Sequence, residues 1–175
     1  MVIHYKCASN IVGLSKSGMG LIPFRTYTKE RILSTGLREQ DINYIYILTE
    51  SPAHSRMGGR CANCCPHILP KLYTYISSLF PKAVVVLKRG GDPFLDFYRI
   101  QSAPVVFCGT ALFCLWPALA NTLGTVFLPI TPLFGGATNT SNAPRLGSNK
   151  VWLPSRYVDS WDGSIENLVQ TLQTK

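Results

Sequence analysis

Acidic residues and catalytic motifs are scarce in this sequence. Of its 175 residues, 9 are Asp or Glu and 3 are His. The sequence has no P-loop, no nucleophile elbow, no metalloprotease motif and no Ser-His-Asp order. Two acids near a predicted strand, Asp41 and Glu50, have no evident partner for general acid–base chemistry. These absences argue against the enzyme classes that such motifs mark.

Long runs of one kind of residue are also missing. The 17 Lys and Arg residues give a net charge of +8, but no basic run is longer than Lys88-Arg89. Scattered charge argues against nucleic acid as a partner. The positive charge would still suit an anionic lipid, a nucleotide or a sugar phosphate, or it could serve solubility alone. The most apolar stretch, 105–119, contains Thr110 and Pro117 and is too short for a membrane span. We therefore expect no integral membrane segment in this chain.

The first ten residues, MVIHYKCASN, do not form a signal peptide, because they lack a basic start followed by an apolar region. The residues VIHY already have the character of a core strand, so we expect a fragment or a reduced gene product. With 46% hydrophobic and 15% charged residues, the chain suits one α/β domain over 1–175 with a substantial core.

Short apolar stretches alternate with helical patterns along the chain. The predicted strands cover 1–7, 44–50, 82–89, 104–108 and 124–130. The predicted helices cover 24–35, 61–80, a segment that begins at Asp92-Pro93, 112–119 and 160–173. A long polar loop spans 131–155, a length typical of functional loops. The alternation predicts an α/β fold with a Rossmann-like parallel sheet of about five strands, which binds its ligand near the turn after the fourth strand.

Two aspartates mark the helix after the third predicted strand. Asp92 precedes Pro93 and is expected to cap the helix, because its side chain accepts from free N–H groups and proline suits the first helical position. Asp96 lies four residues later, near the same face. It either stabilises the helix dipole from a solvated face or points into the crevice, where a carboxylate accepts two hydrogen bonds from guanine.

The turn 108–111 joins the fourth strand to an apolar helix. Glycine lets a ligand approach the backbone, and the N–H groups and dipole of the next helix make an anion site suited to a pyrophosphate. The same residues also fit an ordinary tight turn with Thr110 as the helix cap. The candidate substrate-binding residues here are Cys108, Gly109, Thr110 and Ala111.

His4 and Lys6 alternate along the first predicted strand, so their side chains point to one face near its carboxyl end. Lys6 offers a point charge to a phosphate. His4 is either a second substrate-binding residue or a histidine whose hydrogen bonds are satisfied within the core.

Three of the six cysteines cluster with a histidine, as Cys61, Cys64, Cys65 and His67. These ligand types suit zinc, but a structural zinc site needs a second half-site and the sequence has none. Disulfides are expected if the protein is secretory, and free thiols if it is cytosolic. We expect no metal site and no cofactor, and keep a zinc-stabilised module as an alternative.

The first strand with its His4-x-Lys6 pair, and the segment LDFYRIQSAPVVFCGTALFCLWPALAN, resemble the donor-binding half of inverting fucosyltransferases. This superfamily includes the α1,2- and α1,6-fucosyltransferases and the protein O-fucosyltransferases, and the likeness, over roughly 1–132, is closest to algal or protist members. It implies the fold of the C-terminal half of a GT-B glycosyltransferase, GDP-fucose as donor and a glycan or glycoprotein as acceptor. It also implies a Golgi or secretory location if the gene encodes an upstream anchor.

The resemblance assigns roles residue by residue. In this sequence His4 and Lys6 occupy the family's His-x-Arg positions over the pyrophosphate, Asp96 the guanine-binding aspartate, and Gly109, Thr110 and Ala111 the phosphate-binding turn. Lys6 is then the expected catalytic residue, because its charge stabilises the leaving diphosphate without a metal.

The sequence also departs from the family pattern. Lys6 replaces an arginine that would bind phosphate through two parallel hydrogen bonds, and Ala8-Ser9 replaces a common Gly-Asp. The turn is Gly-Thr-Ala instead of a Ser-Ser or Ser-Thr pair before Phe, and we expect no acceptor-binding half within these 175 residues. A catalytically inactive binding or scaffold domain of the same fold is therefore the alternative.

Overall fold

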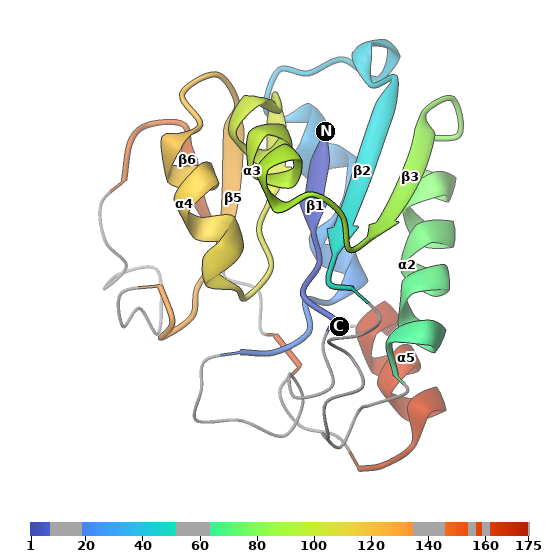
Figure 1. Cartoon of the computed structure of the whole chain (residues 1–175). Coiled ribbons are helices and arrows are strands. Elements are labelled where there is room, and N and C mark those ends of the chain that lie inside the picture. The colour runs from blue at the N-terminus through green and yellow to red at the C-terminus, as the bar shows by residue number, and fades with distance from the viewer. Residues whose placement is uncertain (8–18, 52–63, 135–145, 154–156, 159–161, 175) are drawn as a thin grey trace.

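The computed structural model describes residues 1–7, 19–51, 64–134, 146–153, 157–158 and 162–174. Within these residues, six strands form one parallel sheet in the order β3-β2-β1-β4-β5-β6 (Figure 1). The strands are β1 (Val2–His4), β2 (Tyr44–Thr49), β3 (Val84–Arg89), β4 (Val105–Phe107), β5 (Thr125–Pro129) and β6 (Lys150–Leu153). This is the strand order of a doubly wound Rossmann-like sheet, so the predicted fold class is confirmed.

Helices cover both faces of the sheet (Figure 1). One face carries α1 (Lys29–Leu33), α2 (Cys65–Leu79) and α5 (Ile165–Thr174), together with the short 3-10 helix η1 (Phe24–Thr26). The other face carries α3 (Pro93–Ser102) and α4 (Leu112–Ala120), which pack against each other. A second 3-10 helix, η2 (Glu39–Asp41), precedes β2. The arrangement follows from right-handed β–α–β connections, which move to the opposite face when the chain crosses from β3 to β4.

Alternation along the strands divides the core into two parts. Ile3, Ile47 and Phe107 face α2 and α5, whereas Val2, Leu48 and Val106 face α3 and α4. Because neighbouring residues of a strand point to opposite faces, an unbroken apolar run fills both cores. The same alternation places His4 on the α3–α4 side, beside Phe113.

Two sequence predictions about the elements are wrong. The single helix predicted over 24–35 is broken, because Thr28 takes an extended conformation and its hydroxyl accepts from the Arg31 N–H, which starts a new helix. The stretch 131–155, predicted as loop, contains β6 among its described residues. The strand KVWL has only four residues and follows Gly147, Ser148 and Asn149, so its surroundings have the composition of a loop.

The caps of the helices agree better with the sequence. Asp92 caps α3 by accepting from the Phe94 N–H at 2.9 Å. Gly36 follows α1 with a φ of 87°, the left-handed conformation that glycine adopts freely. None of the helices in the described part of the chain combines the length and the apolar character that crossing a bilayer requires.

Candidate functional site

A cavity of about 340 Å³ opens at the carboxyl ends of β1, β2 and β3. It is bounded by the starts of α3 and α4, and its walls combine three side chains that carry ionisable groups with an apolar surface. The lining residues are His4, Leu48, Thr49, Glu50, Ser51, Gly90, Gly91, Pro93, Asp96, Ala111 and Phe113. The strand order reverses between β1 and β4, and the crevice at such a switch point is where open α/β sheets bind ligands.

Three of the sequence-predicted residues line this cavity. His4 comes from β1, Asp96 from the first turn of α3, and Ala111 from the position that precedes α4. They are far apart in the sequence, and the parallel sheet brings them to one edge. The volume lies at the lower end of the roughly 300–1,000 Å³ that small-molecule sites occupy.

His4 is a buried imidazole in the wall of the cavity. Its ring is 5.8 Å from the Phe113 ring, between centroids, and its Nδ1 atom has no hydrogen-bond partner among the residues that the structure describes. Burial, together with the nearby Lys6 charge, lowers the pKa of His4 to about 4, so the ring is neutral at physiological pH. Leaving a buried nitrogen without a partner costs free energy, which the surrounding packing of the fold must offset.

Asp96 lines the cavity from the first turn of α3. Its Oδ1 atom accepts from Arg99 Nη1 at 2.6 Å, and the Arg99 guanidinium lies 5.4 Å from the centre of the Tyr46 ring. Its Oδ2 atom lies beside Gly91, which also lines the cavity. A carboxylate has lone pairs for about four hydrogen bonds, so Asp96 can hold Arg99 and still accept from a ligand.

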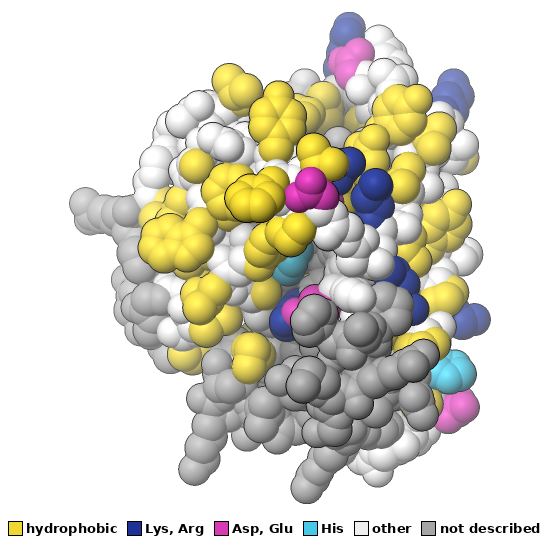
Figure 2. Space-filling model, viewed as in Figure 1, with side chains coloured by type: hydrophobic (Ala, Val, Ile, Leu, Met, Phe, Trp, Pro, Cys, Tyr) yellow, Lys and Arg dark blue, Asp and Glu magenta, His cyan; other side chains and the backbone are white. Residues whose placement is uncertain are grey.

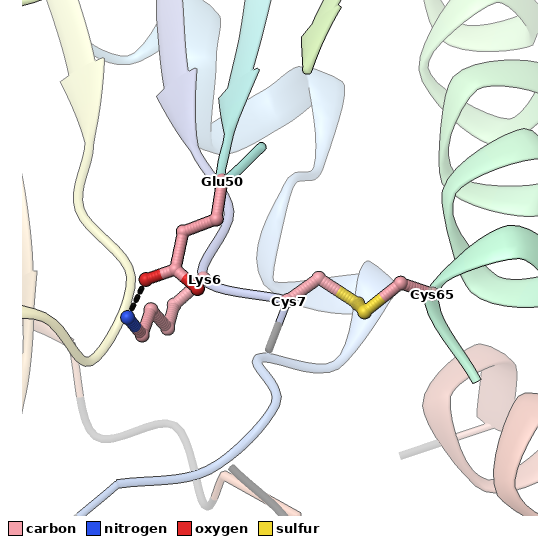
Figure 3. The surroundings of a disulfide bond; sticks show 4 residues. All are labelled: Lys6, Cys7, Glu50 and Cys65. Carbon is pink, nitrogen blue, oxygen red and sulfur yellow. Dashed lines mark ion pairs between the residues drawn. A yellow bond between two sulfur atoms is a disulfide. The ribbon is translucent and has the colours of Figure 1, made fainter. Parts of the chain in front are cut away.

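Lys6 and Glu50 form an ion pair at the same edge, where Figure 3 shows the two side chains directed at each other. Glu50 lines the cavity, whereas Lys6 reaches it only through Glu50. Partial burial lowers the pKa of the Lys6 ammonium. The predicted catalytic lysine therefore has a carboxylate partner that the sequence did not reveal.

The turn 108–111 is held more tightly than its sequence suggests. Cys108 and Cys114 form a disulfide across it, and the Thr110 hydroxyl donates to the Gly20 carbonyl and accepts from the Gly20 N–H. Thr110 is fully buried, and neither it nor Cys108 lines the cavity. The Thr110 hydroxyl, predicted to bind phosphates, is therefore engaged by Gly20 instead.

Gly109 is required where it lies because β1 and β4 approach closely. A Cβ atom there would lie 2.7 Å from the His4 carbonyl oxygen and 3.0 Å from the Lys6 nitrogen, both backbone atoms. Gly109 thus packs against the backbone of His4 and does not itself line the cavity. The cap of α4 is Ala111 and not Thr110, and α4 has neither a side-chain cap nor an acid in its first turn.

Comparison of the chain with protein-family models, with curated proteins and with solved structures yields no match. The resemblance to fucosyltransferases is therefore supported by its motif residues alone.

The cysteine cluster is not a zinc site as far as the structure describes it. Cys65 is bonded to Cys7, and Cys64 is also in a disulfide, so neither sulfur is a thiolate that binds zinc. Cys61 lies outside the described residues, which hold no group of three or more potential metal ligands. The Cys7–Cys65 bond ties the segment after β1 to the start of α2 (Figure 3).

The sequence interpretation missed several residues that line the cavity: Glu50, Gly90, Gly91 and Phe113. Glu50 directly follows β2, and position at the carboxyl end of a strand was a usable signal. Gly90 has a φ of 70°, and a Cβ atom there would lie 2.9 Å from Ser51 Cβ. Gly90-Gly91 therefore lets the end of β3 turn beside Ser51 and leaves backbone atoms exposed to a ligand.

Proposed function

We propose that the chain is a nucleotide-sugar-binding domain of the glycosyltransferase type, with GDP-fucose as the donor. The observation that carries the proposal is that His4 and Asp96 line one cavity at the switch point of the sheet. The resemblance assigns His4 to the pyrophosphate and Asp96 to guanine. Both residues line the same cavity, so one nucleotide could contact both.

The guanine half of the ligand suits the Asp96 side of the cavity. The N1–H and N2–H groups of guanine are adjacent donors, and a carboxylate accepts both. The Oδ2 atom of Asp96 lies beside Gly91, and Pro93 and Leu48 supply apolar surface for the base. Adenine and uracil do not present two such adjacent donors, so this side selects guanine.

The diphosphate suits the His4 side, where α4 begins. The first N–H groups of a helix have no partner within the helix, and its dipole favours an anion at that end. Since α4 has neither a side-chain cap nor an acid in its first turn, these groups are available to a phosphate. Lys6 lies at the same edge and would contribute its positive charge where a diphosphate displaces Glu50 from it.

Sugar transfer would proceed by displacement at the anomeric carbon. An acceptor hydroxyl oxygen forms the new bond to that carbon as its bond to the diphosphate breaks, and GDP leaves with the electron pair. Lys6 and the amides of α4 stabilise the developing charge. Glu50, which lines the cavity, receives the hydroxyl proton, and the acceptor is a glycan or a glycoprotein.

A calorimetric titration with GDP tests the binding proposal. We expect wild-type protein to bind GDP more tightly than ADP or UDP, and Asp96→Asn to weaken GDP binding by about tenfold, the loss of a charged hydrogen bond. Asp92→Asn is the matched control, because Asn caps a helix as Asp does and residue 92 does not line the cavity. Folded protein that binds none of the three nucleotides would refute the proposal.

A catalytically inactive binding domain is the second candidate. The engaged Thr110 hydroxyl and the paired Lys6 favour it, because both groups are held by protein partners. Measuring the release of GDP from GDP-fucose in the presence of acceptor glycans distinguishes an active transferase from an inactive binding domain. Saturable GDP binding with no release above the uncatalysed rate would favour the inactive domain.

We also propose that the protein functions in the secretory pathway, in the Golgi if the full gene encodes an upstream anchor. The Cys7–Cys65 and Cys108–Cys114 disulfides support this, because such bonds persist in oxidising compartments and are rare in the cytosol. Thiol titration of protein purified from its native cell, with alkylation at lysis, tests the location. Reduced Cys108 and Cys114 in that material would contradict it.

A further inference from the structure

The outer surface of α3 and α4 is apolar. Seven large hydrophobic residues of these helices, with Leu123 of the turn after α4, are called here the aromatic face: Phe94 (85% exposed), Leu95 (51%), Phe97 (37%), Tyr98 (65%), Leu112 (49%), Phe113 (41%), Trp116 (64%) and Leu123 (80%). Figure 2 shows hydrophobic side chains gathered over α3 and α4 on the side of the molecule in view.

The packing of α3 and α4 does not explain this face. Each helix already buries another side against the sheet, through Ile100 in α3 and through Cys114 and Ala118 in α4. The outer side of such a helix is normally polar. Exposed apolar patches larger than a few hundred Å² are rare on monomers and mark a surface that binds something.

The face carries almost no charge. The two charged residues of α3, Asp96 and Arg99, pair with each other, and α4 has none. A membrane-binding surface of this size normally has Lys and Arg around its apolar residues, and a partner chosen by charge needs charges to pair with. Since Arg99 is already paired with Asp96 and α4 has no charged residue, these helices offer no unpaired charge, which favours an uncharged apolar partner, although the chain as a whole has a net charge of +8.

The size of the face matches one side of a protein–protein interface. At about 200 Å² for a fully exposed large apolar residue, the exposed fractions amount to on the order of 900 Å². A stable interface of standard size buries about 800 Å² on each partner. A single glycan ring would cover one or two of these aromatic residues and leave the rest in water.

We propose that the aromatic face binds a second copy of this chain, with α3 and α4 of one protomer against α3 and α4 of the other. In a two-fold dimer the same patch meets itself, so an uncharged apolar face is complementary to its own copy. Apolar contact then covers Phe94 and Trp116 without bringing unpaired charges of α3 or α4 together. Phe113 belongs to both the aromatic face and the cavity wall, so the second copy would also border the cavity.

Sedimentation velocity at several protein concentrations tests this proposal, with oxidised protein. We expect wild type to sediment with a mass near twice 19.4 kDa, and Phe94→Glu and Trp116→Glu each to sediment as a monomer. Both side chains are largely exposed, so the substitutions leave the core unchanged, which circular dichroism checks. Tyr73→Glu is the matched control, because Tyr73 is a 40% exposed aromatic residue on α2, at the opposite face of the sheet, and should leave the dimer intact.

Three outcomes would overturn the proposal. Wild-type protein that stays monomeric at the highest concentration removes the second copy as the partner. A dimer that persists in Phe94→Glu and Trp116→Glu places the interface elsewhere. Monomeric wild type that floats with phosphatidylcholine–phosphatidylserine vesicles, while Trp116→Glu does not, assigns the face to a membrane. The test needs no nucleotide, so it is independent of GDP binding.

Discussion

Lys6, which follows β1, and Glu50, which follows β2, form an ion pair at the carboxyl edge of the sheet (Figure 3). The pair exists because β1 and β2 are parallel neighbours, with His4 in register with Leu48. Glu50 lines the cavity, and Lys6 is the cation held next to it. A bound diphosphate would compete with Glu50 for Lys6, so the pair controls both the charge of the site and the position of its lysine.

Neutralising Glu50 should separate binding from transfer. In Glu50→Gln, the amide no longer repels a diphosphate or holds Lys6, and we expect GDP to bind about fivefold more tightly, which corresponds to about 1 kcal/mol. Transfer from GDP-fucose should fall, because the proton acceptor is lost. Calorimetry measures the first effect and GDP release the second. Weaker GDP binding in Glu50→Gln would show that Glu50 holds the ligand and does not oppose it.

Removing the lysine should have the opposite effect on binding. Lys6→Ala deletes a positive charge and leaves Glu50 unpaired in the wall of the cavity. We expect GDP affinity to fall by about tenfold, and to depend less on salt than in wild type. Lys29→Ala, which removes a lysine paired with Glu39, is the control and should leave affinity unchanged. Equal affinities in wild type and Lys6→Ala would exclude Lys6 from the ligand site.

His4 should make the stability of the fold depend on pH. Its pKa is about 4 in the folded protein against 6.5 as the ordinary value, so the unfolded chain binds more protons between these values. The free energy of unfolding should therefore fall as the pH drops from about 6.5 to about 4, by on the order of 3 kcal/mol from His4, and level off below. Above pH 6.5 the contribution is constant.

Urea denaturation across this pH range, with wild type and His4→Gln, measures the effect. The variant should lose most of the pH dependence, whereas His67→Gln, an exposed position on α2, should keep it. If the free energy of unfolding depended on pH equally in wild type and His4→Gln, the folded protein would not contain His4 as a buried, neutral imidazole.

Gly109 should tolerate no side chain. In Gly109→Ala the new methyl group meets the His4 carbonyl oxygen and the Lys6 nitrogen, which are backbone atoms and cannot move without shifting β1. We expect a loss of roughly 1–3 kcal/mol in the free energy of unfolding, the usual cost of overpacking. Gly91→Ala is the control, because its nearest neighbour, Asp96 Oδ2, would be 3.6 Å away. Equal stabilities of the two variants would contradict the close approach of β1 and β4.

The Cys7–Cys65 and Cys108–Cys114 disulfides should contribute unequally to stability. Cys7 and Cys65 are separated by 58 residues and Cys108 and Cys114 by 6, and a longer closed loop loses more entropy in the unfolded chain. The loop-length relation gives about 4 kcal/mol for the first bond and about 2 kcal/mol for the second. Denaturation of the Cys7→Ala/Cys65→Ala and Cys108→Ala/Cys114→Ala variants compares them. A larger loss from the Cys108–Cys114 pair would mean that native-state contacts, not loop closure, decide the cost.

The sequence predicted the sheet well because its signals are local. The runs in β2, β3 and β5 are apolar on both faces, and Asp92-Pro93 and Gly36 mark helix ends by their own chemistry. The strand β6 carries no such signal: it has four residues and, within the described part of the chain, pairs with β5 alone. Its existence depends on a neighbour in space, which propensity does not encode.

The candidate site was predictable only in part, for the same reason. Position at a strand end or helix start was enough to select His4, Asp96 and Ala111. The partners of Lys6 and Thr110 depend on contacts between distant segments: Glu50 joins Lys6 through adjacent strands, and Gly20 takes the Thr110 hydroxyl across 90 residues of sequence. Residue type alone therefore predicted that Lys6 and Thr110 are available to a ligand, whereas both are held by partners within the protein.

The most direct test of the account is the imidazole NMR spectrum of histidine-labelled, oxidised protein during a GDP titration. Histidine-to-glutamine variants assign the signals. We predict that the His4 resonances shift and saturate with GDP, because His4 lines the cavity, while those of His67, on α2, do not move. A folded protein whose His4 resonances stay fixed at saturating GDP would contradict the claim that this cavity is a nucleotide site.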